Sequence, residues 1–175
     1  MGLITISSIS GGGKTTVSKA LAEKLKNCKL LHFDEVDNLV VFPENFPNAN
    51  VSEFDLTLLK NYFEKKFKPE DLVIFDFPFG RAHSDFNKKI DLALYLDLPE
   101  ETALQRRAKR DKVIEKIERK HYSSVRPAYL RFIEEVRPSC ELLVDASVAV
   151  DEIVNYIITH IEFTPFLSDM KSKYL

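Results

Sequence analysis

The chain has 175 residues, 45% of them hydrophobic and 30% charged, so we expect one globular domain with a full core. Its net charge of −2 argues against a general nucleic-acid-binding protein, which would usually be basic. No apolar run reaches the ~20 residues that span a bilayer, and we expect no membrane partner and a cytoplasmic location. Cys28 and Cys140 lack metal-site spacing and predict free thiols.

The first half of the chain predicts a buried strand over residues 3–7, a helix over 14–26 and a second strand over 29–33. Prolines and asparagines mark an irregular segment over residues 43–50. Ser52 is a candidate cap for the next helix. Apolar residues of that helix repeat at helical spacing, at Phe54, Leu58, Leu59, Tyr62 and Phe63.

The second half contains two continuous apolar runs at residues 72–76 and 92–96. Such runs are typical of central parallel strands, which are buried on both faces. Pro99 fits the first turn of a charged helix that we expect to continue to about Arg119. A further helix is predicted to begin at Pro127.

A short last strand at 142–144 and an amphipathic helix at 149–161 complete the pattern, and residues 164–175 have no strong pattern. Five strands that alternate with helices predict an α/β fold, an open parallel sheet between two layers of helices. Ligands bind such sheets at the carboxyl ends of the strands. Asp34 and Asp76 both fall at strand ends of this kind.

The most informative stretch is Ser8–Thr16, where a glycine-rich turn and Lys-Thr stand between a strand and a helix. This is the layout of a phosphate-binding P-loop. Glycines let successive N–H groups turn inward, and the positive end of the helix points at the same place. The usual motif opens with glycine where this chain has Ser8. The candidate nucleotide-binding residues are Ser10, Gly11, Gly12, Gly13, Lys14, Thr15 and Thr16.

The P-loop residues and the acids at the strand ends predict a catalytic set. Lys14 would reach the β- and γ-phosphates, and the Thr15 hydroxyl would ligate Mg²⁺ together with Asp76. A kinase that acts on a hydroxyl needs a carboxylate beside that hydroxyl, for which Asp34 is the first candidate and Glu35 the second. The alternative for each acid is that it caps a neighbouring helix.

Two basic regions are further candidates. Gly80 makes a turn that can carry Arg81 and His83 over the site, where they would contact a polar or anionic acceptor. Both side chains fit an ordinary surface loop equally well. Arg107 and Arg110 are three apart in a predicted helix and therefore share a face. Arginines on a helical lid at about 100–125 would stabilise the charge of phosphoryl transfer and exclude water, so one of these two is a candidate catalytic cation.

The P-loop, the strand that ends at Asp34 and the run Arg106–Asp111 resemble the uridine kinase and nicotinamide riboside kinase group. The resemblance covers roughly residues 3–160, with residues 38–70 matching poorly. It implies a nucleoside-monophosphate-kinase-like P-loop NTPase fold and transfer of phosphate from ATP, with Mg²⁺, to a hydroxyl of a small molecule. It also implies that Asp34 is the base. Val36 stands where the family has an aromatic residue, which argues against a flat nucleobase acceptor.

The leading hypothesis is therefore a small-molecule kinase, with a nucleoside-like acceptor favoured. One alternative is a kinase for a phosphorylated acceptor, of nucleoside-monophosphate or dephospho-coenzyme A type, with Arg81 as the anion contact. Another is a nucleotide-binding protein without transferase activity. A switch GTPase is disfavoured because in the nearest match to Asn-Lys-x-Asp, residues 87–91, the aspartate comes one place late. We expect residues 38–70 and 77–90 to build the acceptor pocket.

Overall fold

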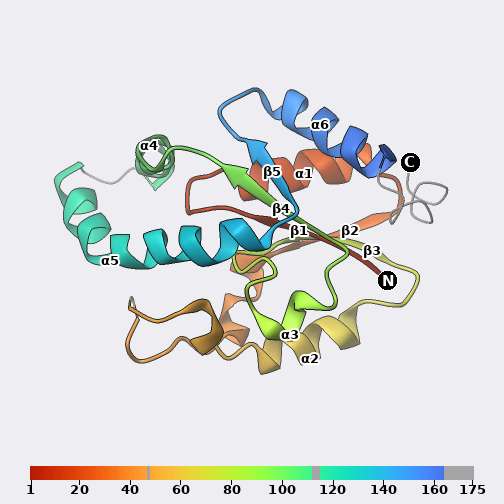
Figure 1. Ribbon diagram of the computed structural model, residues 1–175, viewed down its shortest axis with the longest axis horizontal. Helices are drawn as coiled ribbons and strands as arrows, with labels where there is room; N and C mark the ends of the chain where they lie inside the picture. Colours follow the sequence, from red (N-terminus) through yellow and green to blue (C-terminus); the bar gives the residue numbers. More distant parts are fainter. Residues whose placement is uncertain (47, 112–114, 164–175) are drawn as a thin grey trace.

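Five parallel strands form one sheet with the order β2-β3-β1-β4-β5 in the computed structural model, which describes residues 1–46, 48–111 and 115–163 (Figure 1). Strands β1 and β3 are buried almost throughout, because helices cover both faces of the sheet. Strand β5 lies at the edge and alternates between buried and exposed residues. The strands are β1 (Gly2–Ser7), β2 (Cys28–His32), β3 (Leu72–Asp76), β4 (Leu92–Asp97) and β5 (Leu142–Asp145).

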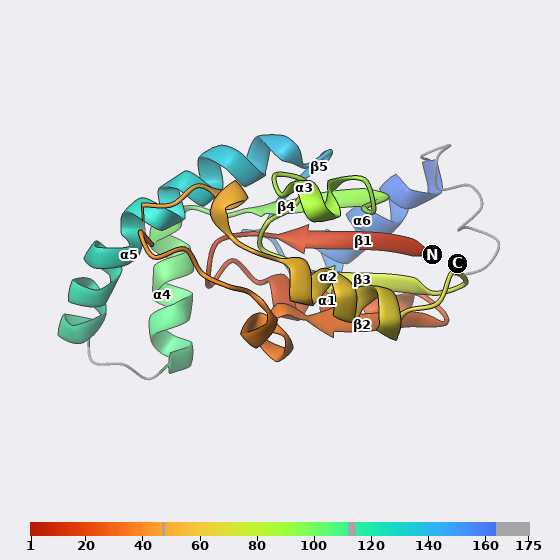
Figure 2. The same cartoon turned by 90° about the horizontal axis from the view of Figure 1, so that it is seen from below.

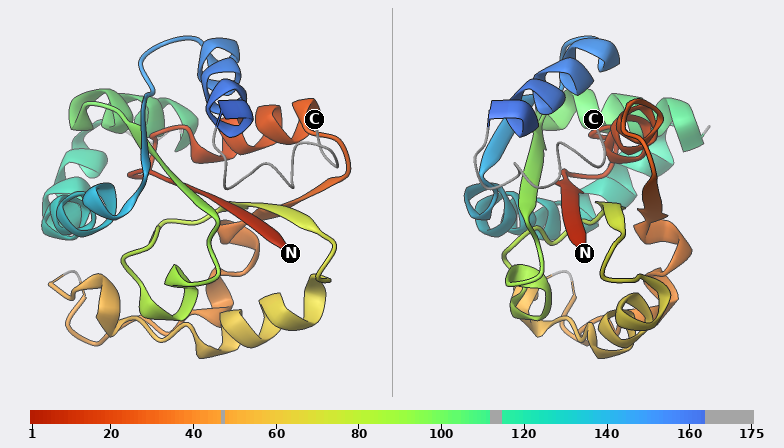
Figure 3. Two further views of the ribbon diagram at one scale, coloured as in Figure 1. Left: turned by 45° about the vertical axis from the view of Figure 1, so that its right-hand side comes forward. Right: turned by 90° about the vertical axis from the view of Figure 1, so that its right-hand side faces the viewer.

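Two helical layers enclose the sheet, so the predicted three-layer α/β/α fold with five parallel strands is confirmed (Figure 3). Helices α1 and α6 lie on one face, and α2 and α3 lie on the other. Helix α4 and the first part of α5 stand side by side beyond the carboxyl ends of the strands, and the rest of α5 runs back along the sheet toward β5 (Figure 2). The helices are α1 (Lys14–Lys24), α2 (Thr57–Lys66), α3 (Ser84–Asn87), α4 (Glu100–Asp111), α5 (Glu115–Val136) and α6 (Val150–Phe163).

Strand alternation divides the apolar side chains between two cores. Ile4 and Ile6 of β1 face α1 and α6, whereas Leu3 faces α2. The second core is rich in aromatic rings, and its Phe75 and Phe77 stack with centroids 4.8 Å apart. The same aromatic layer continues toward the carboxyl ends of the strands through Phe79. The packing that holds α2 on the sheet is therefore continuous with the walls of the cleft described below.

The structure corrects two predicted helix starts. Ser52 does not cap α2, because Asn50 and Glu53 form a capping box around a short 3₁₀-helix and α2 begins only at Thr57. Pro127 does not begin a helix but lies inside α5. A proline inside a helix removes a backbone hydrogen bond and bends the axis, and α5 changes direction along its length (Figure 1).

The remaining helix predictions need smaller changes. The helix predicted over 14–26 ends at Lys24. The charged helix that was expected to reach Arg119 is described over Glu100–Asp111 as α4, and residues 115–119 belong to α5. The connection 112–114 within the predicted lid and the segment 164–175 lie outside the described residues. In the described part of the chain, no helix combines the length and the apolar character needed to cross a bilayer.

Candidate functional site

The turn between β1 and α1 has the backbone conformation of a phosphate cradle. Gly11 and Gly13 have φ angles of 87° and 95°, which residues other than glycine rarely adopt. A Cβ atom at Gly11 would collide with the backbone carbonyl of Ala103 in α4. Glycine is therefore required here both for the turn and for the close approach of α4 to the loop.

Ser8, the departure from the usual motif, has a structural role. Its hydroxyl is buried and donates a 2.7 Å hydrogen bond to the carbonyl of Leu96 at the end of β4. A Cβ atom at Gly12 would occupy the position of that hydroxyl. The serine therefore ties the loop to β4, and Gly12 leaves the space for it.

Lys14 lies at the centre of the site. Its amine donates a 3.2 Å hydrogen bond to the carbonyl of Ser8 within the same loop. Burial lowers the pKa of this amine, and the nearby carboxylates of Asp76 and Asp34 oppose that effect, whereas Arg110 adds to it. The lysine is therefore desolvated and lies within electrostatic reach of both predicted acids.

Thr15 and Asp76 form a pair in which the threonine hydroxyl donates to a carboxylate oxygen, Oδ2, over 2.6 Å. Asp76 is 4% exposed, and its other oxygen, Oδ1, is buried with no hydrogen-bond partner among the described residues. The Nδ1 atom of His32 lies 3.7 Å from Oδ2, because residues 32 and 76 are paired in the sheet. A buried carboxylate oxygen without a partner suits a hard cation.

The oxygen atoms of Thr15 and Asp76 fit a Mg²⁺ site that is completed by water and phosphate, and not a metal site made of protein ligands alone. Within the residues described, no group of three or more His, Cys, Asp or Glu side chains could hold a metal ion. Mg²⁺ usually keeps several waters and takes one or two protein ligands together with substrate phosphates. Thr15, where the P-loop runs into α1, and Asp76, at the end of β3, match that pattern.

Three arginines of α4 line the same cleft. Both terminal nitrogens of Arg106 lie 3.3 Å from the carbonyl of Ala146. Arg107 donates to the hydroxyl of Tyr129 in α5 and lies 6.0 Å from the centre of its ring. Arg110 influences the pKa of Lys14. The predicted cations Arg107 and Arg110 are thus brought to the P-loop, and Arg106 joins them.

A cleft of about 900 Å³ runs along the carboxyl ends of the strands and contains the whole P-loop. One end is aliphatic, formed by the β5–α6 connection and the start of α6. The other end is aromatic and includes Asp34, which is exposed to the cleft. The aliphatic lining residues are Ala146, Val148, Val150 and Ile153, and the aromatic end is formed by Phe33, Phe42, Phe46, Phe54, Pro78, Phe79 and Phe132.

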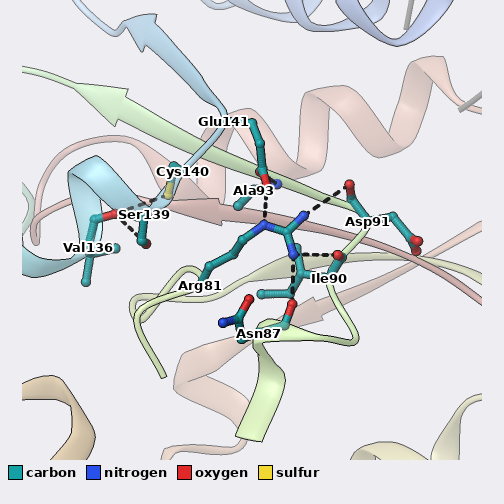
Figure 4. Close-up of polar contacts among 9 residues, drawn as sticks. All are labelled: Arg81, Asn87, Ile90, Asp91, Ala93, Val136, Ser139, Cys140 and Glu141. Atoms are coloured by element: carbon teal, nitrogen blue, oxygen red, sulfur yellow. Dashed lines mark hydrogen bonds and ion pairs between the residues drawn. The ribbon is translucent and has the colours of Figure 1, made fainter. Parts of the chain in front are cut away.

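Arg81 does not line the cleft, contrary to expectation. Figure 4 shows its guanidinium between Glu141, with which it forms an ion pair, and the carbonyls of the 87–91 segment. Its Nη1 atom donates to the carbonyls of Asn87 and Ile90, each over 2.7 Å, and Nη2 donates to that of Asp91 over 3.3 Å. Arg81 therefore joins the loop after β3 to the start of β5.

The same network buries the thiol of Cys140. The sulfur donates to the carbonyl of Val136, and burial raises its pKa to about 11 (Figure 4). Gly80 has a φ angle of 51°, and a Cβ atom there would lie 3.0 Å from this sulfur. The predicted turn at Gly80 is thus real, but it packs against the residues that follow α5.

His83 and Glu35 are also outside the cleft lining. The Nε2 atom of His83 donates to the carbonyl of Phe54 over 2.8 Å, and its Nδ1 atom accepts from the N–H of Asp85. Because this hydrogen bond is buried, His83 holds the loop that carries Phe54 in place. Glu35 is exposed next to Asp34 but does not line the cleft.

Comparison with known proteins agrees with this geometry. Residues 4–126 match a protein family described as an AAA domain. The chain belongs to this family. A uridine kinase from Latilactobacillus sakei is 25% identical over 196 residues, covering 89% of this chain and 92% of that protein. The P-loop kinase relationship predicted from the sequence is therefore confirmed.

Solved structures of two kinases and of one uncharacterised protein share the fold of this AAA-domain protein. A gluconokinase from Sinorhizobium meliloti has a TM-score of 0.55 and 16% identity, with 90% of each chain covered. A shikimate kinase from Aquifex aeolicus has a TM-score of 0.56 and 17% identity, covering 91% of this chain and 96% of that chain. An uncharacterised protein from Eubacterium ventriosum has a TM-score of 0.59 and 20% identity, covering 93% and 99%.

Replacing Ser8 by alanine tests its structural role. We expect the free energy of unfolding to fall by about 1 kcal/mol, because one buried hydrogen bond to Leu96 is lost. The affinity for Mg·ATP should stay within about two-fold, since the backbone cradle is unchanged. Urea denaturation and calorimetry measure the two quantities. Thr159→Ala, which removes an exposed hydroxyl bonded to a carbonyl in α6, is the control. A large loss of nucleotide affinity in Ser8→Ala alone would contradict this role.

Arg81→Ala tests the assignment of that arginine to the framework. We expect a loss of about 2 kcal/mol in the free energy of unfolding, because charge-assisted bonds to Glu141 and to loop carbonyls disappear. Nucleotide affinity should be unchanged. Lys88→Ala, an exposed change in the same loop, should alter neither quantity. If Arg81→Ala kept full stability but lost binding of an anionic acceptor, a substrate-contacting role would be correct instead.

Proposed function

We propose that the protein is an ATP- and Mg²⁺-dependent kinase that transfers the γ-phosphoryl group to a hydroxyl of a small molecule, with a nucleoside-like acceptor favoured. The observation that carries the proposal is that Lys14, the Thr15–Asp76 pair and Asp34 line one cleft. The named relatives and structural neighbours, a uridine kinase, a gluconokinase and a shikimate kinase, are small-molecule kinases and support it.

The donor half of the cleft suits a nucleoside triphosphate. The P-loop N–H groups and the N-terminus of α1 would hold the phosphates, with Lys14 on the β- and γ-phosphates. The aliphatic end beside Ala146 and Val148 offers an apolar surface for the base. The planar guanidinium of Arg106 borders that surface and is held by the carbonyl of Ala146.

Thr15 and Asp76 would hold the metal, since the Thr15 oxygen can bind a cation while its hydrogen is donated to Asp76. A bound Mg²⁺ supplies charge neutralisation for the phosphate oxygens. Arg107 and Arg110 would add positive charge from α4, the first helix of the proposed lid at about 100–125. Closure of such a lid would exclude water and so favour transfer to the acceptor over hydrolysis.

Asp34 is the proposed base. The acceptor hydroxyl would donate a hydrogen bond to its carboxylate, which orients the oxygen toward the γ-phosphorus. As the new P–O bond forms, the bond to the β-phosphate oxygen breaks and ADP leaves. The hydroxyl proton passes to Asp34 late in transfer. Asp34 is exposed to the cleft and lies within electrostatic reach of Lys14, which supports this assignment.

The alternative of a phosphorylated acceptor has lost its proposed anion contact, because Arg81 is bound to Glu141 and to three carbonyls. A nucleotide-binding protein without transferase activity would bind Mg·ATP and phosphorylate nothing. A screen of alcohols with ATP and Mg²⁺, in which phosphate adducts are detected by mass spectrometry, distinguishes that alternative from a kinase.

Asp34→Asn is the sharpest test of the mechanism. The amide keeps the shape but cannot accept a proton, so we expect kcat to fall by about 100-fold or more. Mg·ATP affinity should stay within about two-fold. Glu35→Gln is the matched control, because it makes the same chemical change at the adjacent exposed acid and should leave kcat unchanged. Equal effects of the two variants would contradict the assignment of the base.

Asp76→Asn tests the metal site. The neutral amide weakens cation binding, so the Mg²⁺ concentration that gives half-maximal activity should rise by about ten-fold or more. Titration of activity with Mg²⁺ at constant ATP measures this quantity. Metal-free nucleotide should bind the variant at least as tightly as the parent, because a negative charge near the phosphates has been removed. An unchanged Mg²⁺ requirement would exclude Asp76 from the metal site.

A further inference from the structure

We infer that the acceptor is an uncharged alcohol whose body is an apolar planar ring, held by shape rather than by hydrogen bonds to the edges of the ring. This inference rests on the proposed function and names the class of its acceptor. Its basis is the set of six rings at one end of the cleft, called here the ring box: Phe33, Phe42, Phe46, Phe54, Phe79 and Phe132.

The ring box is assembled from four separate parts of the chain around Phe54. The Phe54 ring lies 5.1 Å from that of Phe79 and 5.6 Å from that of Phe132, measured between centroids. Phe42 lies 5.3 Å from Phe54 at an interplanar angle of 69°, and Phe46 lies 6.4 Å away at 81°. The contacts of Phe54 with Phe42, Phe46 and Phe132 are edge-to-face, an arrangement that aromatic rings prefer. Another planar ring can extend the same pattern.

The six rings differ sharply in exposure. Phe54 and Phe79 are 2% and 1% exposed and form the floor, whereas Phe42 and Phe46 are 51% and 41% exposed. The last two meet edge-to-face at 5.9 Å and 90° on the cleft side. Keeping two large rings half in water is unfavourable, and a planar ligand would remove that apolar surface from water.

Charge favours a neutral acceptor body. Among the described residues that line the cleft, the cationic side chains are Lys14, Arg106, Arg107 and Arg110. All four belong to the P-loop or to α4, at the phosphate end. Arg131 in α5 does not line the cleft and acts electrostatically on Glu53 instead. Among the described lining residues, a carboxylate placed in the ring box would therefore have no facing cation, and its desolvation would be costly.

Polar side chains in the ring box are equally sparse. Of the described lining residues at this end, Asp34 carries the carboxylate, and the hydroxyl of Tyr129 accepts from Arg107. The other side chains are phenylalanine, proline and alanine. Asp34 directly follows Phe33 of the box, so a ring seated among the phenylalanines would direct an attached hydroxyl toward the proposed base.

Phe46→Trp provides a binding assay that does not depend on turnover. The chain has no tryptophan, so the introduced indole is a unique fluorescent probe in the ring box. The probes are uridine, its analogue in which phenyl replaces the base, 2-phenylethanol and gluconate. We expect the phenyl riboside to bind at least as tightly as uridine, 2-phenylethanol to saturate the signal, and gluconate to cause no change up to about ten times the Kd of the phenyl riboside.

The outcomes separate this inference from the proposed function. If ring alcohols saturate the signal but none is phosphorylated, the kinase proposal fails and the ring box stands. If gluconate is phosphorylated and ring alcohols do not bind, the kinase stands and the inference is overturned. Uridine binding more than about ten-fold tighter than the phenyl riboside also overturns it, because hydrogen bonds to the base would then dominate.

Phe42→Ala tests the contact by turnover. We expect the KM of the phenyl riboside to rise by about ten-fold, with the KM of ATP unchanged, since only the acceptor end is altered. Leu58→Ala removes a similarly exposed apolar side chain from α2, away from the cleft, and should change neither KM. Equal KM values for the phenyl riboside in Phe42→Ala and in the parent protein would overturn the inference.

Discussion

The parallel pairing of β1 with β3 is the constraint on which the site depends. Ile6 is paired with Asp76, so β3 ends where β1 runs into the P-loop, and Thr15 at the start of α1 can donate to the Asp76 carboxylate. The pairing of β2 with β3 then places His32, and Asp34 shortly after it, beside the same strand end. A shift of one residue in β3 would turn Asp76 toward the other face of the sheet and separate the proposed metal ligands.

The two faces of the sheet explain why the ends of the cleft differ in chemistry. The core between the sheet, α1 and α6 is aliphatic. Where this core reaches the carboxyl ends of the strands, it forms the end of the cleft beside Ala146 and Ile153. The core on the α2 face is aromatic, and its edge forms the ring box. Each half of the cleft thus extends the packing beneath it. A change at Phe54 or Phe79 would therefore alter both the core and the proposed acceptor end.

The fold could be predicted from the sequence, and so could the meeting of the P-loop with Asp34 and Asp76, because the signals for both are local. A strand, a glycine turn and Lys14-Thr15 are contiguous, and strand ends converge in any parallel sheet. For the ring box the sequence indicated only the segments 38–70 and 77–90. It could not show that Phe42, Phe79 and Phe132 meet, because they are far apart along the chain and phenylalanine is ordinarily a core residue. Arg81 and His83 lie outside the cleft lining, although both follow β3 closely in the sequence. Their positions shortly after β3 suggested that they would reach the cleft. Hydrogen bonds to the backbone carbonyls of Ile90 and Phe54 instead hold them among the loops beside it.

Lys14 shows how the folded protein prepares the site for an anion. Burial lowers the pKa of this amine, so the apo fold disfavours its charged form relative to the unfolded chain. Between the lowered pKa and the ordinary value of 10.5, the unfolded chain binds more protons, and the stability of the apo protein therefore rises with pH across that window. In the proposed complex a bound triphosphate would reverse the balance, because a nearby negative charge favours the ammonium and raises its pKa. The carboxylates of Asp34 and Asp76 offset only part of the electrostatic cost of burying Lys14, and the phosphates would relieve the rest.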